Sequence, residues 1–421
     1  MKILHFADVH LGMENYGKFD PETGLNSRLG DFLRSFDFLV AAAKKNKVDL
    51  VLFAGDAFKT REPSPTYQKA FAEKIYELAS ADIPVVLLVG NHDFPGALGK
   101  AHTLEIYPTL NVPKVYMVSD EVKTIQTKSG PIQIAGLPWY TKQQLLSKGD
   151  LKLPLEKMRE KLSRRLAEKV DYLSSKIDPK IPSILLAHTS VEGATFGSER
   201  SVMIGSDIIL PLASLRHSRF NYVALGHIHK HQELSKNLPR RQAGPPIVYA
   251  GSIERIDFGE EKEDKGFILI KMYASPKAMQ SSRPKFQTQW NFIKTPARKF
   301  LTIHVKIGDD DDADEKISQA IQKEKTNEAV VRVIIETNEG KSAEISDSKI
   351  RAALSRADFI AGITREIKGH ARTQIKNGFS DELASLDTLG ILEKYLQTKK
   401  VSQFRKQELL KTAEKLIEET M

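Results

Sequence analysis

The sequence predicts an α/β protein with two sheets sandwiched between helices, followed by a smaller α+β unit and a helical tail. Short β-prone apolar runs alternate with amphipathic segments along the first half of the chain, which is typical of sheets with buried strands. Polar residues follow five of these runs directly, where loops at one sheet edge would bring them together. The length of 421 residues exceeds one ordinary core, so we expect two or three domains.

The first unit begins with a strand at residues 3–7 and an amphipathic helix at 28–46, where apolar residues recur at helical spacing. A strand at 48–54 and a helix at 66–80 follow. The remaining strands are expected at 83–89, 115–118, 132–137, 184–187, 222–225, 247–250 and 267–272, with a charged helix at 152–176.

The second half of the chain changes character. Serine and proline residues between positions 274 and 298 mark a connector, so the first domain is placed at residues 1–285. A compact α+β module is expected at residues 299–370, and two amphipathic helices are expected in the tail at 385–421. The elements expected in the module are strands at 300–307, 329–336 and 359–363 and helices at 315–325 and 348–357.

Composition narrows the possible functions. The chain has no cysteine, so a metal would need His, Asp, Glu or Asn ligands. The formal net charge of +9 favours a polyanionic partner, although many basic proteins bind no nucleic acid. The chain has no run of about 18 apolar residues, and its first apolar run breaks at Asp8. We therefore expect no membrane helix, no signal peptide and a cytoplasmic location.

The candidate site residues lie in five places, each directly after an expected strand. Taken singly, each place has a simpler interpretation, because Gly, Asn and Asp favour polar turns and a strand-end histidine is more often a core residue. Five such places in order are hard to explain by coincidence. The residues are Asp8 and His10, then Asp56, then Asn91, His92 and Asp93, then His188, and finally His227 and His229.

These residue types form a donor set. Carboxylates, imidazoles and one amide oxygen are suitable ligands for Mn, Fe or Zn. The groups are too many for one tetrahedral ion but reasonable for two ions that share a bridging carboxylate. The sequence therefore predicts a two-metal site at the sheet edge.

In chain order the motifs read D-x-H, G-D, G-N-H-D, a lone H and G-H-x-H. They resemble the signature of the calcineurin-like metallophosphoesterase family over roughly residues 1–270, and within that family the chain is similar to the SbcD-type DNA repair nucleases. Residues 3–12, 63–65, 249–252 and 257–260 support this likeness. The resemblance implies a four-layer αββα sandwich with a small α+β capping domain and C-terminal helices.

The resemblance also implies roles for single residues. Asp56 would bridge two divalent ions, expected to be Mn, and His92 would act as a general acid or as a donor to developing charge. Asp93 would orient His92 and keep it protonated. The expected ligands are Asp8, His10, Asp56 and His229 for one ion, and Asp56, Asn91, His188 and His227 for the other.

The implied function is that of a metal-dependent DNA nuclease, with exonuclease and endonuclease action, which processes DNA ends in double-strand-break repair. Its partners would be DNA, the coiled coil of an SbcC-type ATPase, bound by the tail helices, and a second copy in a homodimer. Some relatives carry a histidine where this chain has Lys59. Because that histidine is associated with exonuclease action, the balance of the two actions stays open.

Two other functions stay open at this point. A phosphatase or nucleotidase for small phosphoesters would use the same kind of site. Protein phosphatases of the family usually continue the second motif as G-D-x-x-D-R-G, which this chain does not do after Asp56. A DNA-binding or scaffold protein with an inactive site is the third interpretation, and the presence of every expected ligand argues against it.

Overall fold

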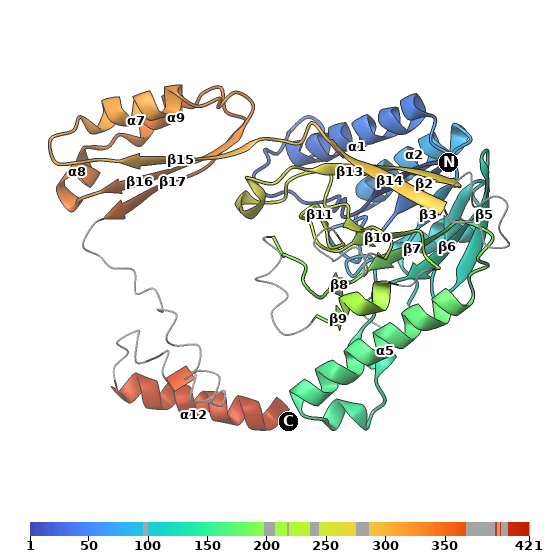
Figure 1. The fold of residues 1–421 in the computed structure, drawn as a ribbon. Coiled ribbons are helices and arrows are strands. Elements are labelled where there is room, and N and C mark those ends of the chain that lie inside the picture. The colour runs from blue at the N-terminus through green and yellow to red at the C-terminus, as the bar shows by residue number, and fades with distance from the viewer. Residues whose placement is uncertain are drawn as a thin grey trace.

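The computed structural model of the protein shows a large body of two sheets with flanking helices, a smaller α+β body and a C-terminal helix (Figure 1). The residues that the structure describes are 1–95, 100–197, 207–216, 219–235, 244–274, 286–367, 392–393, 396 and 403–420.

Six strands form the first sheet. In spatial order they are β14 (Phe286–Lys294), β13 (Gly266–Ala274), β1 (Lys2–Phe6), β2 (Leu50–Phe53), β3 (Val85–Leu87) and β4 (Val115–Met117). The strands β1 to β4 run parallel, whereas β13 pairs antiparallel with both β1 and β14. Every residue of β2 and β3 is buried, which explains why both strands appear in the sequence as continuous apolar runs.

The second sheet also has six strands. In spatial order they are β11 (Gln232–Glu233), β12 (Ile247–Tyr249), β10 (Tyr222–Gly226), β7 (Ser183–His188), β6 (Gly130–Leu137) and β5 (Val122–Thr127). The four inner strands run parallel, and the two outer strands pair antiparallel with their neighbours. Both sheets therefore have a parallel centre, whose strands end at a common edge.

Alternating side chains divide the large body into three cores. In β2, Leu50 and Leu52 pack between the two sheets, whereas Val51 and Phe53 pack against helices on the outer face. The second sheet repeats this pattern with Leu185 of β7, which packs on the helical side. The helices that cover the outer faces are α1 (Ser27–Asn46) and α2 (Pro65–Ser80) on the first sheet and α5 (Leu155–Ser175) on the second. This order of layers confirms the predicted αββα sandwich.

The smaller body, here called the capping module, has one sheet with helices. Its strands pair in parallel in the order β15, β16, β17, and its core lies between this sheet and the helices. Its elements are β15 (Phe300–Lys306), α7 (Ala313–Gln322), β16 (Val330–Thr337), α8 (Glu339–Glu344), α9 (Asp347–Ala353) and β17 (Phe359–Ile367).

Three edge strands of the two six-stranded sheets were not predicted from the sequence, namely β5, β14 and the two-residue strand β11. The strand β5 has a single buried residue, Ile125, so it lacks an apolar run. The strand β14 lies beyond the predicted domain boundary at residue 285, in the expected connector, yet it pairs with β13 along its whole length. Its residues alternate between half-buried and exposed over most of its length. Edge strands covered on one face give weaker hydrophobic signals than central strands, which are buried on both.

The tail contains α12 (Gln403–Thr420), which agrees with the second helix expected there. Most of the first expected tail helix, and the start of the second, lie outside the described residues. Within the described part of the chain, no helix is long and apolar enough to cross a membrane. The shorter elements are α3 (Ile106–Thr109), α4 (Lys142–Leu145), β8 (Ser190–Val191), β9 (Ile209–Leu210), and the 3-10 turns η1 (Thr103–Glu105), η2 (Asp150–Lys152), η3 (Leu212–Leu215) and η5 (Phe258–Glu260).

Candidate metal centre

The structure brings the seven expected ligands together at the edge where the parallel strands of both sheets end. Six of them are buried, and Asn91 is half-buried. The first sheet contributes four residues and the second sheet three. They are Asp8 and His10 after β1, Asp56 after β2, Asn91 after β3, His188 at the end of β7, and His227 and His229 after β10.

The loops that carry these side chains turn sharply. Four of the seven residues have a left-handed backbone, which is uncommon for residues other than glycine. Conformations of this kind persist where the surrounding structure fixes them, and they cluster at functional sites. The four residues and their φ angles are Asp8 (52°), His10 (50°), Asp56 (61°) and His227 (97°).

Gly90 allows the loop after β3 to approach the loop after β2. A Cβ atom at position 90 would lie 2.1 Å from Oδ1 of Asp56 and 2.5 Å from its backbone nitrogen. Any larger residue would therefore displace the Asp56 carboxylate, because real Cβ atoms do not approach other atoms so closely.

One half of the centre joins the two sheets through His10 and His229. Their Nε2 atoms lie 3.0 Å apart, and Nε2 of His10 lies 3.6 Å from Oδ2 of Asp56. Asp8, His10 and His229 each offer one ligand atom within 4.8 Å of the others. The backbone N–H of His227 donates to both oxygens of the Asp8 carboxylate, at 2.9 and 3.1 Å, which fixes that carboxylate across the sheets.

The other half gathers around Asn91. Its Oδ1 atom lies 3.0 Å from Nε2 of His188 and 3.0 Å from Nδ1 of His227. Nε2 of His188 also lies 3.5 Å from Oδ2 of Asp56. Asp56 thus approaches ligand atoms of both halves, as a bridging carboxylate would.

Three of the histidine rings are held by a hydrogen bond on their outer side. Nδ1 of His188 donates to the backbone oxygen of Ala54 (2.7 Å), which leaves Nε2 free to face the centre. Nδ1 of His229 donates to Oε1 of Glu260 (2.8 Å), and Nε2 of His227 donates to Oδ2 of Asp207 (3.1 Å). Such partners fix the tautomer and the ring orientation of metal-binding histidines.

Asp207, Glu260 and Trp139 also contact the expected ligands, although the sequence motifs predict no role for them. Asp207 follows no long apolar run, so no pattern marked it. Trp139 comes just after β6, at the same edge as the expected ligands, and its ring lies 4.8 Å from the ring of His227. An aromatic residue directly after an expected strand was therefore a usable signal.

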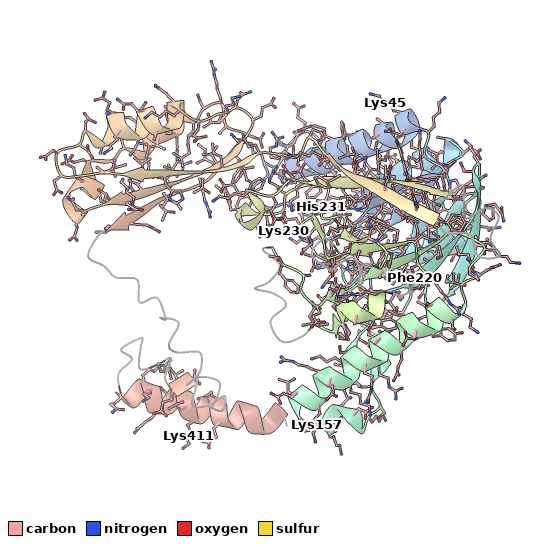
Figure 2. All side chains as sticks on the ribbon, viewed as in Figure 1. Lys45, Lys157, Phe220, Lys230, His231 and Lys411 are labelled. Atoms are coloured by element: carbon pink, nitrogen blue, oxygen red, sulfur yellow. The ribbon has the colours of Figure 1, made fainter. Side chains whose placement is uncertain are left out.

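The strand exit after His229 is anchored as well. Figure 2 shows Lys230 and His231 on the side of the large body that faces the capping module. The His231 ring stacks on Phe292 with ring centres 4.1 Å apart, and its Nδ1 atom donates to the backbone oxygen of Tyr249 (2.8 Å). These contacts fix the chain on the C-terminal side of His229, one of the expected ligands.

The expectation that Asp93 orients His92 is wrong. Nδ1 of His92 donates to the backbone oxygen of Lys59 (2.7 Å). The carboxylate of Asp93 is buried and instead accepts backbone N–H groups of Asp56 (2.8 Å), Ala57 (2.9 Å) and Gly90 (3.1 Å). Three backbone donors in the loops satisfy this carboxylate, so Asp93 holds the loops and not the imidazole.

His92 itself lies at the centre. Its backbone N–H donates to Oδ1 of Asp56 (2.8 Å), and its ring lies 4.8 Å from the ring of His10, edge to face. His92, His10 and Asp56 also form a group whose ligand atoms all lie within 4.8 Å of one another. His92 is therefore close enough to act on a group bound at this centre.

The electrostatics of the centre favour a positive charge. Burial alone would lower the pKa of His188, but the carboxylate of Asp56 outweighs burial and raises that pKa to about 9. Burial keeps the pKa of His10 well below its usual range, so this imidazole stays neutral and keeps a lone pair. Buried carboxylates beside the neutral His10 imidazole match the donor chemistry of divalent transition metals, and a bound ion would displace the proton that the His188 ring holds.

The family model described as calcineurin-like phosphoesterase matches residues 1–231, which is more than half of the chain. The chain therefore belongs to the calcineurin-like phosphoesterase family, whose members hydrolyse phosphoesters. This membership confirms the predicted class of enzyme, a metal-dependent hydrolase acting on ester bonds.

Within the family, the chain is similar to Mre11 and SbcD proteins. It is 25% identical over 374 residues to the DNA double-strand break repair protein Mre11 of Aeropyrum pernix, across 86% of this chain and 80% of that protein. It is 28% identical to the SbcD component of the SbcCD nuclease of Staphylococcus epidermidis and 27% identical to that of Bacillus subtilis. Those matches cover 64% and 60% of this chain and just under two thirds of the relatives, 66% and 63%. The resemblance to the SbcD-type nucleases is thereby confirmed.

Proposed function

We propose that the protein is a metal-dependent nuclease that hydrolyses phosphodiester bonds of DNA at ends that require repair. The match to an Mre11 repair protein over 86% of the chain, capping module included, carries this proposal. The basic balance of the chain supports a polyanionic substrate, since 63 Lys and Arg residues face 54 Asp and Glu residues.

The proposed cofactor is a pair of divalent ions, Mn in preference to others. One ion would be held by Asp8, His10, Asp56 and His229, and the other by Asp56, Asn91, His188 and His227, as the two halves of the centre suggest. When bound, two such ions supply positive charge for the phosphoryl oxygens and increase the acidity of nearby water.

The protein residues would supply positioning and a proton. His92 is proposed as the general acid, because its Nδ1–H is already used by Lys59 and its Nε2 atom is left for the substrate. The fixed rings of His188, His227 and His229 would keep the site in one geometry before substrate arrives.

We propose two protein partners from apolar side chains that stay exposed on helices. The helix α12 is proposed to bind the coiled coil of an SbcC-type ATPase, and its Leu409, Leu410 and Ala413 side chains stay partly exposed. A homodimer is proposed through α1 and α2, where Phe38 and Tyr76 are 40% and 67% exposed.

A nuclease assay tests the proposal. Full-length protein with Mn²⁺ is given end-labelled blunt, hairpin and single-stranded DNA, with and without an SbcC-type ATPase, and mononucleotides in parallel. We expect cleavage of DNA that EDTA abolishes and the ATPase increases. Cleavage of mononucleotides with intact DNA would instead establish the alternative, a phosphatase or nucleotidase.

A pair of matched variants removes doubt about contaminating nucleases. Asp56→Asn should abolish DNA cleavage, because the variant removes the carboxylate that approaches both halves of the centre. Asp20→Asn changes an exposed aspartate that bonds within its own loop and should cleave as the native protein does.

A further inference from the structure

The turn η5 lies between the metal centre and the capping module and touches both. Its residue Glu260 is fully buried and faces the metal centre, whereas Phe258 and the next residue, Glu261, face the capping module. The contacts to the metal centre and to the capping module come from neighbouring residues of one short turn. A displacement of the capping module would therefore also move the residue that contacts His229.

On the inner side, the carboxylate of Glu260 contacts His229, Ile256 and Lys265. Oε1 accepts the Nδ1–H of His229 (2.8 Å), and Oε2 accepts the backbone N–H of Ile256 (2.8 Å). Oε2 also pairs with Nζ of Lys265 at 3.0 Å. These contacts fix the position of the carboxylate. Its hydrogen bond to Nδ1 in turn fixes the orientation of the His229 ring.

Lys265 strengthens this arrangement because it also binds His229. Its buried ammonium group donates to the backbone oxygen of His229 (3.2 Å) as well as pairing with Glu260 and with Glu263 (3.0 Å). The ring and the backbone of one metal ligand are thus both held by residues 256–265.

On the outer side, the capping module holds the turn. The guanidinium of Arg332 lies 4.3 Å from the centre of the Phe258 ring, and the Phe300 ring packs edge-on at 5.1 Å. Thr302 donates its backbone N–H to Oε1 of Glu261 (2.8 Å), and Nε of Arg332 donates to the Thr302 hydroxyl (2.8 Å). Strands β15 and β16 both take part in these contacts.

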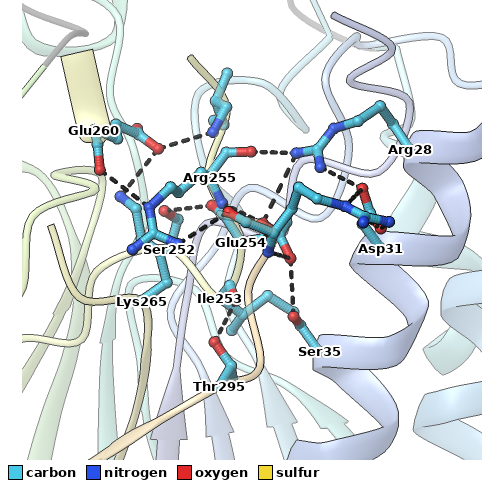
Figure 3. Close-up of polar contacts among 12 residues, drawn as sticks. Arg28, Asp31, Ser35, Ser252, Ile253, Glu254, Arg255, Glu260, Lys265 and Thr295 are labelled. Atoms are coloured by element: carbon cyan, nitrogen blue, oxygen red, sulfur yellow. Dashed lines mark hydrogen bonds and ion pairs between the residues drawn. The ribbon is translucent and has the colours of Figure 1, made fainter. Parts of the chain in front are cut away.

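Arg255 connects the same turn to the segment that enters the capping module. Its guanidinium donates to the backbone oxygens of Glu260 (3.3 Å), Glu263 (2.7 Å) and Arg298 (3.0 Å). Figure 3 shows this network around Arg255 and its continuation through Glu254 to Arg28 and Asp31 of α1. The joint is therefore built from many directional contacts and has little freedom to slide.

We propose that Glu260 is a positioning residue for the metal ligand His229, and that η5 couples the place of the capping module to metal binding. The inference rests on the proposed metal site and adds to it a mechanical connection. A substrate that shifts the capping module would change the affinity of the centre for its metal through this turn, and metal binding would in turn favour one place of the module.

Two variants test the two ends of the connection. Glu260→Gln removes the charge that orients the His229 ring and should weaken Mn²⁺ binding about 10- to 100-fold, as measured by calorimetric titration of the metal-free full-length protein. Arg332→Met removes the guanidinium over Phe258, within the capping module, and should weaken Mn²⁺ binding about fivefold. The double variant should bind as Glu260→Gln does, because both changes act through one turn.

The control for Arg332→Met is Arg365→Met. Arg365 lies in the same sheet and pairs with Asp347 and the backbone of Ile345, away from η5. The Arg365→Met variant should bind Mn²⁺ with the same affinity as the native protein. Thermal unfolding in EDTA shows whether each variant folds. If Glu260→Gln does not fold, the comparison of Arg332→Met with Arg365→Met still tests whether the capping module is coupled to metal binding through η5.

The outcomes are distinguishable from failure of the proposed function. Native protein that binds no Mn²⁺ would overturn the metal chemistry and this inference together. Native protein that binds Mn²⁺, with folded Glu260→Gln or Arg332→Met binding equally well, would overturn the coupling alone. Equal weakening by Arg332→Met and Arg365→Met would also overturn it, since the effect would then not pass through η5.

Discussion

His10 and His229 face each other through their Nε2 atoms across a gap of 3.0 Å, and each ring comes from a different sheet. Nδ1 of His229 already donates to Glu260, so in the neutral ring Nε2 is the nitrogen that carries the lone pair. Two imidazole nitrogens at this distance need a shared proton or a cation, and a divalent cation fits the neighbouring Asp8 and Asp56 carboxylates.

Metal binding should therefore stabilise the fold. With Mn²⁺ at a hundredfold excess over its dissociation constant, the free energy of unfolding should rise by about 2.7 kcal/mol. Thermal unfolding in EDTA and in Mn²⁺ measures the difference, and His10→Ala should reduce it strongly. An unchanged melting temperature in Mn²⁺ would contradict the site.

His92→Ala should keep bound Mn²⁺ and lose DNA cleavage by a factor of about 10² to 10⁴, as expected when a general acid is removed. Elemental analysis of the purified variant measures the metal, and a labelled duplex measures cleavage. His92 lies close to His10 and Asp56, so loss of metal in this variant would show that His92 is a ligand.

Asp93→Asn should destabilise the metal-free protein by about 1–3 kcal/mol, because the carboxylate accepts three buried backbone donors and one amide oxygen satisfies fewer. Urea unfolding in EDTA measures this change. His92→Ala serves as the comparison, since its ring makes one hydrogen bond to Lys59 and should cost less. Equal stability of Asp93→Asn and the native protein would disprove the structural role.

Gly90→Ala should weaken Mn²⁺ binding about a hundredfold, because the added Cβ would displace the Asp56 carboxylate and misplaced ligands lose their geometry. The matched control is Gly30→Ala in α1, where a Cβ meets no atom within 4 Å. That change should stabilise the helix by about 0.5–1 kcal/mol and leave Mn²⁺ binding unchanged. Similar Mn²⁺ affinity in both variants would show that the loop after β3 can move to make room for the Cβ atom without displacing the Asp56 carboxylate.

Lys59→His should shift the balance of products towards exonuclease release of nucleotides. The contact to His92 uses the backbone oxygen of residue 59, so the substitution leaves that contact in place. The ratio of nucleotide release to hairpin opening measures the shift. An unchanged ratio would show that the side chain at this position does not set the balance.

The sequence predicted the sandwich, and it predicted which residues would meet at the sheet edge, because both depend on local patterns. Buried central strands give continuous apolar runs, and residues at their ends must meet at one edge, as Asp56 and His188 do. The outer partners of the ligands could not be predicted in this way. Glu260 meets His229 through a turn that begins 29 residues later, and Asp207 meets His227 from a segment without a hydrophobic pattern.

Asp93 shows a different limit of sequence reasoning. Its place beside His92 in the chain suggested a carboxylate–imidazole pair, whereas three backbone N–H groups of neighbouring loops compete for the same carboxylate. Backbone donors that must be satisfied when buried leave no trace in the sequence.

The division of the ligands between the two sheets has a consequence for the whole large body. Each proposed ion would take ligands from both sheets, with His229 opposite His10 and His188 opposite Asp56. The metals would then connect the two sheets at the edge where their parallel strands end. Without the metals, the sheets would be held together mainly by the apolar side chains of the core between them. Hydrogen exchange of the amides at the ends of β1 and β10 would therefore slow as metal binds. Metal binding, on which the enzyme's chemistry depends, and local opening of the two sheets would be coupled equilibria.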